Sequence, residues 1–397
     1  MPLYTVVQKL VLMKLVPVKM GNGGKELFLH GDTMKNMKKW VERVFRLKSE
    51  RGAVAIIVGI SMAMFIGFTA LAVDIGYVMV TRNELQNVAD ASALAGTRWL
   101  GNNYEGMDYG EQQNYVCDPA PIMTVVNGVA SQNRAGGVYI NTINSADVVI
   151  GRWDAASSTL TPTLNQPDAV RVTARRDGSA NGPITTFFAG ILGIHTAGVT
   201  AFATAALTPQ STAGPGGLPI PVGISRFRLE SEFCDQPIKF SPTGTIEGCA
   251  GWHTYDQSPA SASTLRNILT GLKNGTFQSP ETTAGVTQFV FTGGVVASAF
   301  NEMEALFDAM KVLNDGVRDD DDDPNTWTTS VVVYDKGDCS NPNGPITIVG
   351  FATATISEVI GPPCKIIQAT IKCERTAPGR GGGGSYGTKG SIPGLVE

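Results

Sequence analysis

The chain has 397 residues, of which 17% are charged, and its formal net charge at pH 7 is −4. The absence of a basic bias argues against a nucleic-acid partner. The length leaves room for a membrane helix and two modest domains, and the 46 glycines and 22 prolines suit a loop-rich β structure.

Residues 1–52 form a basic segment that we expect to stay in the cytoplasm. Residues 1–33 have no clear period, whereas Met34 and Met37 both open a compact basic stretch. We predict that the natural start is one of these two methionines. The first thirty-odd residues are then either weakly structured or an artefact of the assigned start.

Residues 54–73 contain no charged side chain, and we assign residues 53–80 to a transmembrane helix. At about 1.5 Å of rise per residue, the apolar run covers roughly 30 Å, the hydrocarbon thickness of a bilayer. A buried helix of a soluble core is the first alternative, but such helices are usually shorter and keep a polar edge. A cleaved signal peptide is the second, but its apolar region is typically about 7–15 residues long.

Positive charge gathers before the span, and the next cation after it is Arg82. Basic flanks stay in the cytoplasm, so we expect a single-pass inner-membrane protein whose C-terminal bulk is periplasmic or extracellular. The basic residues before the span are Lys35, Lys38, Lys39, Arg43, Arg46, Lys48 and Arg51.

Asp74 directly follows the apolar run. We expect it at the membrane interface on the translocated side, where water and headgroups can reach a carboxylate. Binding of a partner helix is the alternative role.

Helical spacing continues past the span into a stalk, within a membrane-proximal α+β domain assigned to residues 81–207. Small side chains crowd the stalk and allow close approach of another element. That element can belong to the same domain or to another molecule, and the sequence leaves both open. The candidate packing residues are Leu85, Ala89, Ala93 and Gly96.

The pattern after the stalk predicts helices and strands in alternation. Residues 121–133 and 182–194 have an amphipathic helical pattern. Alternation of apolar and polar residues predicts strands, best seen at Val170 and Val172 against Arg171 and Thr173. The predicted strands cover residues 146–154, 159–163, 168–176 and 197–207.

Glycine and proline mark residues 208–221 as a linker before a distal β-rich domain, residues 222–378. One helix is expected over residues 300–313, and the strand pattern predicts an antiparallel sheet with one exposed face. The Gly-rich tail, residues 379–397, is either flexible or an extended segment that adds to a partner's sheet edge. The predicted distal strands cover residues 289–294, 328–335, 346–360 and 365–373.

All six cysteines lie after the span, which suggests disulfides in an oxidising compartment. Six cysteines allow fifteen connectivities. Proximity favours Cys234 with Cys249, and it suggests Cys339 with Cys364 or Cys373.

Few residues offer chemistry. No spacing fits a zinc site, and no known catalytic or phosphate-binding motif occurs. The aspartates at 319–323 suit a solvated loop better than a calcium site, and turn chemistry accounts for the carboxylates of residues 334–344. We therefore expect no catalytic residue, no metal and no cofactor.

Residues 51–96 resemble the N-terminal module of TadG-like Flp pilus-assembly proteins of bacteria. The shared pattern is an Arg-Gly pair before the span, a helix ending in A-V-D-x-G, and then L-Q-x-A-x-D-A-x-A-L-A-G. Val88 stands where the family often has alanine. The segments around residues 170–207 also resemble the part that follows in such proteins. The matched positions are Ala72, Val73, Asp74, Gly76, Leu85, Gln86, Ala89, Asp90, Ala91, Ala93, Leu94, Ala95 and Gly96.

The resemblance implies a non-enzymatic single-pass envelope protein that takes part in assembling or anchoring tight-adherence pili. Its implied partners are the lipid bilayer and pilus-assembly or pilin proteins, and the oligomeric state is left open. The metal-binding DxSxS turn of some relatives is missing, and Ile57 stands where prepilin peptidase substrates carry glutamate. A membrane-tethered binding module or adhesin is the alternative function, and a hydrolase of another type is the third.

Overall fold

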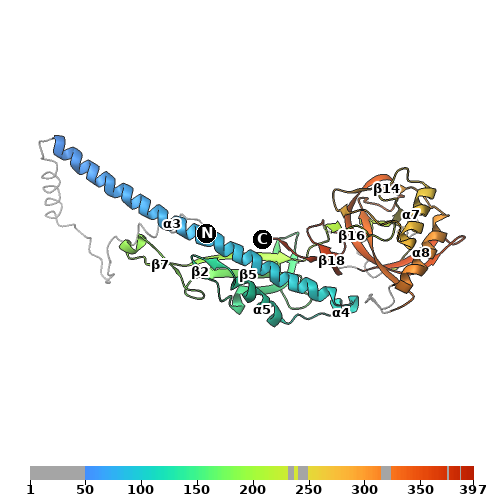
Figure 1. Ribbon diagram of the computed structural model, residues 1–397, viewed down its shortest axis with the longest axis horizontal. Helices are drawn as coiled ribbons and strands as arrows, with labels where there is room; N and C mark the ends of the chain where they lie inside the picture. The colour runs from blue at the N-terminus through green and yellow to red at the C-terminus, as the bar shows by residue number, and fades with distance from the viewer. Residues whose placement is uncertain (1–49, 231–236, 240–248, 314–322, 373–374, 385) are drawn as a thin grey trace, which may run out of the picture. The chain divides into compact units, whose positions relative to one another are not determined.

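A computed structural model describes residues 50–230, 237–239, 249–313, 323–372, 375–384 and 386–397 (Figure 1). The described residues divide into two compact units, with the boundary between Thr69 and Ala70. Helix α3 (Glu50–Glu105) begins in the first unit and continues into the second, where it is followed by strands and shorter helices. The expected α+β class, with a long apolar N-terminal helix before β-rich domains, is confirmed.

Helix α3 has two differently patterned halves. Its apolar window is 0% buried, and among the described residues it is one helix long and apolar enough to cross a membrane. From Leu85 onward, one face is buried and the other is polar, so this half behaves as a packed helix of a water-soluble domain. No break separates the halves.

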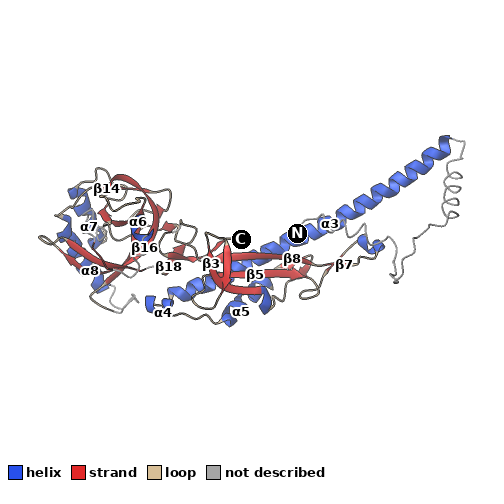
Figure 2. Cartoon of the chain, turned by 180° about the vertical axis from the view of Figure 1, so that it is seen from behind, coloured by secondary structure: helices blue, strands red, loops and turns tan. Residues whose placement is uncertain are grey.

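A five-stranded antiparallel sheet stands beside the second half of α3, in the strand order β20-β8-β5-β3-β4 (Figure 2). Helix α5 (Pro119–Ala130) starts where the Asp118 carboxylate accepts a hydrogen bond from the Ala120 N–H and Pro119 occupies the first turn. The strands are β3 (Val148–Asp154), β4 (Thr159–Pro162), β5 (Ala169–Arg176), β8 (Val199–Ala206) and β20 (Gly394–Leu395).

Alternation along β5 separates a dry face from a wet face, as predicted. Val170 and Val172 are fully buried beneath α3 and α5, while Arg171 and Thr173 point to the other side and are partly exposed. At Gly96, an added Cβ would lie 3.1–3.3 Å from side chains of both α5 and β5, so the absence of a side chain lets α3 sit close to them.

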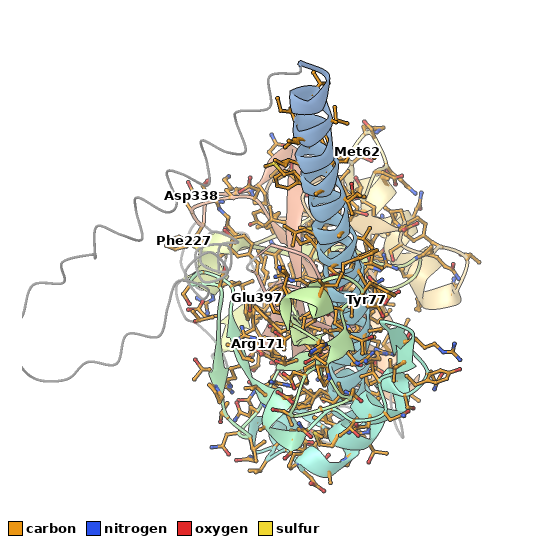
Figure 3. All side chains as sticks on the ribbon, turned by 90° about the vertical axis from the view of Figure 1, so that its left-hand side faces the viewer. Met62, Tyr77, Arg171, Phe227, Asp338 and Glu397 are labelled. Atoms are coloured by element: carbon orange, nitrogen blue, oxygen red, sulfur yellow. A yellow bond between two sulfur atoms is a disulfide. The ribbon has the colours of Figure 1, made fainter. Side chains whose placement is uncertain are left out.

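The end of the chain returns to this sheet. Strand β20 pairs antiparallel with β8, and the backbone N–H groups of Thr204 and Val396 donate across the pair at 2.9 Å. Glu397 forms an ion pair with Arg171, and Figure 3 shows both side chains together. The tail therefore extends a sheet edge, but the edge belongs to its own chain.

The distal part is built on a seven-stranded sheet in the order β11-β17-β16-β15-β10-β12, with β14 pairing β16 off this path. Its strands are mostly antiparallel, but β10 and β15 run parallel. The strands are β10 (Val222–Ser225), β11 (Pro237–Lys239), β12 (Ala250–Trp252), β14 (Gln288–Thr292), β15 (Trp327–Tyr334), β16 (Asn343–Ile360) and β17 (Ile366–Lys372), and the helices are α6 (Arg226–Glu230), α7 (Ala262–Asn274) and α8 (Ala299–Leu313).

Short elements complete the described chain. Helix α4 follows α3, and several two-residue strands close loops or pair across them. They are α4 (Tyr109–Gln113), β1 (Arg134–Ala135), β2 (Val138–Tyr139), η1 (Ser145–Asp147), β6 (Ile184–Thr185), η2 (Ala189–Leu192), β7 (Thr196–Ala197), β9 (Thr212–Ala213), β13 (Thr282–Thr283), β18 (Thr376–Arg380) and β19 (Lys389–Ile392).

The expectation that one face of the distal sheet is exposed is wrong at its centre, where residues 351–356 are all buried. Helix α8 covers one face and places Phe300 against Trp252, with ring centroids 5.3 Å apart. Strand β14 folds over the other face and places Phe291 against Tyr334, at 4.7 Å. A strand buried on both faces loses the alternation that predicted an exposed side.

Two separate clusters of buried side chains run through the second unit. One uses residues between 85 and 207, and the other uses residues between 213 and 371. The exact domain boundaries, including the linker at 208–221, stay predictions.

His253 is fully buried in the distal cluster among aromatic rings. Its ring lies 4.7 Å from that of Tyr255 and 4.8 Å from that of Phe289, and its Nδ1 accepts a hydrogen bond from the Tyr255 N–H. Burial lowers the pKa of His253 to about 3. The imidazole is therefore neutral in the fold at every pH at which the protein is expected to work.

Gly101 gives a test of the contact between α3 and the returning tail. An added Cβ would lie 1.9 Å from the Ser391 carbonyl oxygen. We expect Gly101→Ala to lower the free energy of unfolding by about 1–3 kcal/mol, because β19 must move. Gly128→Ala is the control, since Gly128 is exposed within α5 with nothing within 4 Å. It should raise stability by about 0.5–1 kcal/mol. Chemical denaturation of the full chain in detergent measures both, and equal shifts would contradict the contact.

The pKa of His253 predicts how stability depends on pH. Below the ordinary pKa of about 6.5, His253 binds a proton in the unfolded chain, whereas in the folded chain it stays neutral down to about pH 3. Stability is therefore complete above pH 6.5 and falls by up to about 1.4 kcal/mol per pH unit below it. His253→Phe should remove this share of the fall between pH 6.5 and 5. The free energy of unfolding of both proteins is measured by chemical denaturation at several pH values in that window. If it falls equally with pH in both, the lowered pKa of His253 is refuted.

Candidate membrane-anchoring site

Asp74 lies where the apolar run of α3 ends, and its side chain is turned into the fold with 5% exposure. Its carboxylate accepts three hydrogen bonds from consecutive backbone N–H groups. Phe187 donates to Oδ1 at 2.7 Å, while Phe188 and Ala189 donate to Oδ2 at 3.0 and 2.5 Å. Hydrogen bonds to a charged acceptor are the stronger kind, so this buried charge is compensated.

The three donors belong to a hairpin, and the amphipathic helix predicted over residues 182–194 is wrong. Strands β6 and β7 pair instead, and only the short 3₁₀ helix η2 forms between them. Pro183 has no N–H to contribute, and Gly193 takes a left-handed conformation (φ 82°) that ends η2. Asp74 supplies, from outside the segment, the acceptor for donors at the start of η2 that have no helical partner.

An aromatic contact reinforces the same junction. The rings of Tyr77 and Phe187 meet edge to face with centroids 5.3 Å apart. The Tyr77 hydroxyl donates to the Gly136 carbonyl oxygen at 3.1 Å, so this helix turn holds the hairpin and the β1–β2 loop together. Figure 3 shows Tyr77 on the helix.

The candidate packing residues of the stalk face the domain of their own chain in this structure. Leu85, Ala89 and Ala93 are fully buried in the proximal cluster, and Gly96 lies against α5. A contact between stalks of different molecules is not needed to bury them.

The cysteines are paired differently from the prediction. Cys249 is bonded to Cys339, so the expected pair of Cys249 with Cys234 is corrected, as is the pairing of Cys339 with Cys364 or Cys373. Proximity in sequence could not predict this pair, because the two cysteines are separated by 90 residues and come together only in the folded distal part. Cys234 and Cys373 lie outside the described residues, and Cys117 is buried with a free thiol.

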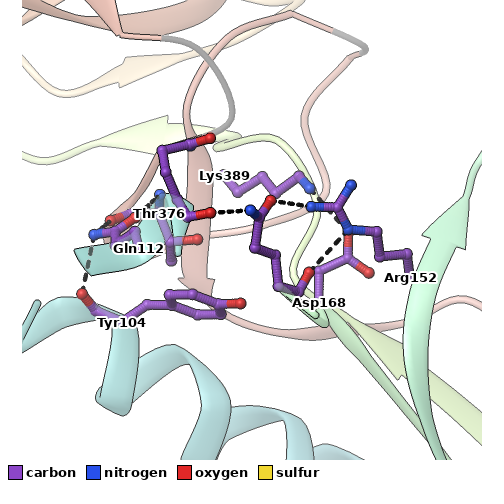
Figure 4. Close-up of a pocket in the computed structure, with 8 residues that line it drawn as sticks. Tyr104, Gln112, Arg152, Asp168, Thr376 and Lys389 are labelled. Atoms are coloured by element: carbon purple, nitrogen blue, oxygen red, sulfur yellow. Dashed lines mark hydrogen bonds and ion pairs between the residues drawn. The ribbon is translucent and has the colours of Figure 1, made fainter. Parts of the chain in front are cut away.

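A small polar pocket lies where the tail meets the proximal domain (Figure 4). Gln112 and Thr376 exchange two hydrogen bonds, at 3.0 and 3.2 Å, and the Lys389 ammonium lies 2.8 Å from the Asp168 carboxylate. Because these polar groups bond to one another, we interpret the pocket as a contact between the tail and the proximal domain and not as a ligand site. Its lining residues are Tyr104, Gln112, Gln113, Arg152, Gln166, Asp168, Thr376 and Lys389.

We find no candidate metal site in the part of the chain that the structure describes. No group of three or more His, Cys, Asp or Glu side chains there could hold an ion. Residues 319–322 of the acidic run lie outside the described ranges.

Sequence reasoning missed the hairpin that Asp74 holds, together with the apolar side chains at its tip. The signal was present, because residues 183–194 contain no charge and Gly190 and Gly193 interrupt the apolar positions. Glycines so placed favour a turn over a continuous helix.

Fold and site together define a class of protein. It is an α+β protein with one N-terminal helix of membrane-spanning length and apolarity, whose unbroken continuation forms part of a folded domain.

Comparison with known families narrows this class. Residues 52–98 match the family described as Flp pilus-assembly TadE/G-like, and residues 80–205 match the family described as Tad-like Flp pilus-assembly. Residues 52–205 are therefore similar to TadE/G-like Flp pilus-assembly proteins, and the predicted resemblance to TadG-like proteins is confirmed for this part of the chain. Neither the search of curated proteins nor that of solved structures found a match.

Removal of the Asp74 carboxylate tests how the hairpin is held. Asp74→Ala leaves three N–H groups without their acceptor, and we expect amide exchange over residues 184–196 to accelerate by roughly ten- to a hundredfold. Hydrogen–deuterium exchange with mass spectrometry on the full chain in detergent measures this. Asp154→Ala is the control, because Asp154 bonds only within its own turn, to Ala156 and Ser157. Unchanged exchange in Asp74→Ala would show that the carboxylate does not hold the hairpin.

Proposed function

We propose that this chain is a non-enzymatic, single-pass inner-membrane protein that anchors or supports the assembly of Flp pili. One observation carries the proposal: the family matches span both the apolar helix and the domain built on its continuation, and a single unbroken helix joins the two. A membrane anchor and a folded domain that share one continuous helix suit a structural role.

The way the second half of α3 is packed supports this role. A flexible tether would need a glycine- or proline-rich joint, whereas this helix runs from Glu50 to Glu105 without one. Small residues seat it against α5 and the sheet, and Thr97 Oγ1 donates to the Ala205 carbonyl oxygen at 3.1 Å. The second half of α3 is therefore built into the domain rather than linked to it by a flexible segment.

The proposed orientation follows from charge. Basic residues precede the apolar run, and the folded part after it contains a disulfide. Cytoplasmic flanks are enriched in Lys and Arg, and disulfides persist in oxidising compartments. Both observations favour a cytoplasmic N-terminus and an exported C-terminal bulk.

A membrane-tethered adhesin is the second candidate function. It is favoured by the distal part, which has its own buried cluster and lies beyond the family matches. In that case the distal sheet would present a ligand-binding surface, and the anchor would serve only as a tether.

Excision of the distal part separates the two candidates. The Ser211 N–H donates to the Arg380 carbonyl oxygen at 2.8 Å, so residues 212–379 can be replaced by a short Gly-Ser linker while β20 stays on the sheet. The excised protein is expressed in a pilus-forming host that lacks its own copy. We expect it to reach the membrane but to fail to restore assembled pili, whereas the full chain restores them. Electron microscopy and a surface-attachment assay provide the readouts. Normal pili with lost attachment would support the adhesin instead.

Two controls accompany this experiment. The excised protein must remain in the membrane fraction at the level of the full chain, which excludes loss by degradation. Alkaline phosphatase appended after Glu397 should be active, because we propose that this end is exported. An inactive fusion together with a cytoplasmic location would contradict the orientation.

A further inference from the structure

The tip of the β6–β7 hairpin gathers large apolar side chains on its surface. We define the apolar tip as Phe187, Phe188, Ile191, Leu192 and Ile194, whose exposed fractions are 63, 42, 83, 55 and 37%. Single exposed apolar residues are ordinary, but five of them between residues 187 and 194 of one hairpin indicate an interaction surface.

The fold holds these side chains outward with many hydrogen bonds. Besides the three bonds to Asp74, the Thr186 N–H donates to the His195 carbonyl oxygen at 3.1 Å. The Ile194 N–H donates to the Ala189 carbonyl oxygen at 3.0 Å. These bonds fix the backbone of the loop, and this backbone presents the five apolar side chains at the surface.

The place of the hairpin indicates what covers the tip. Asp74 directly follows the apolar residues 54–73, so the loop bonded to it lies at the level where that run ends. Leu71 and Val73, on the adjoining turn of α3, are also exposed, at 43 and 46%. Residues 183–194 carry no charged side chain. An apolar, uncharged surface that is hydrogen-bonded to the residue at the end of an apolar run fits a lipid surface.

We propose that the apolar tip inserts into the headgroup and upper acyl region of the bilayer. The protein then contacts the membrane at two places, the span and the tip, with Asp74 as the joint between them. The inference rests on the proposed membrane span, but it does not depend on which side of the membrane the tip lies. Two contacts would restrain the tilt and rotation of the exported domain, which one helix alone would leave free.

The test places a fluorescent amino acid at one position of the full chain by stop-codon suppression, which leaves the cysteines unmodified. The chain is reconstituted in phosphatidylcholine vesicles with a nitroxide on the upper part of the acyl chain. We expect a probe in place of Ile191 to lose roughly half of its fluorescence, as an interfacial group should. A probe in place of Val286, exposed at 76% in the distal part, should lose none.

A third probe, in place of Phe65 within the apolar run, keeps the inference separate from the proposed span. With a nitroxide deep in the bilayer, it should be quenched. Quenching at Phe65 with none at Ile191 overturns the apolar tip as a lipid contact and leaves the span intact. No quenching at either position overturns the span.

Two further arms separate other occupants. If the probe at Ile191 is shielded from water only in vesicles with several copies, and is exposed at one copy per vesicle, a second chain covers the tip and the inference fails. Because the tip is uncharged, quenching should be the same at low and high salt. A loss of quenching at high salt would show attachment through other, charged groups and would also overturn the inference.

Discussion

The structure depends on the continuity of helix α3, which stays unbroken through an apolar run and beyond, so no loop intervenes where the run ends. The membrane span proposed for this run requires such continuity, because a backbone in lipid must satisfy its own hydrogen bonds. The same rod then changes from apolar on all sides to apolar on one side, and it becomes the helix on which the proximal sheet packs. The apolar run and the helix on which the proximal domain packs are therefore parts of a single secondary-structure element.

Asp74 occupies the position at which those two patterns meet. A buried carboxylate is costly unless its oxygens are bonded, and three backbone N–H groups of the β6–β7 hairpin supply those bonds. The same N–H groups at the start of η2 would otherwise have no acceptor. The hairpin supplies hydrogen-bond donors to the buried carboxylate of Asp74, and the carboxylate supplies an acceptor to the N–H groups of the hairpin. This explains why a charged residue follows directly on an apolar run more fully than exposure to headgroup water does.

Local patterns predicted local structure well. The apolar run, helix α5, the alternation along β5 and the strands β14 to β17 all follow from spacing that neighbouring residues determine. The failures concern partners distant in sequence. The hairpin depends on Asp74, the Cys249–Cys339 bond spans 90 residues, and strand β20 joins a sheet built almost two hundred residues earlier. The two-sided burial of β16 was also missed, because α8 and β14 cover faces that the sequence alone leaves open.

The path of the chain relates the part that matches the family models to the rest of the protein. The matches end at residue 205, on strand β8, yet the outer neighbour of β8 is β20, which comes from the far end of the sequence. Ser211 and Arg380 lie side by side, so the distal cluster of residues 213–371 is enclosed between two adjacent points of the chain. Insertions with close ends disturb a host domain little. The distal part is therefore attached to the proximal domain through two neighbouring points of the chain, and the sheet that carries β8 and β20 is closed without it.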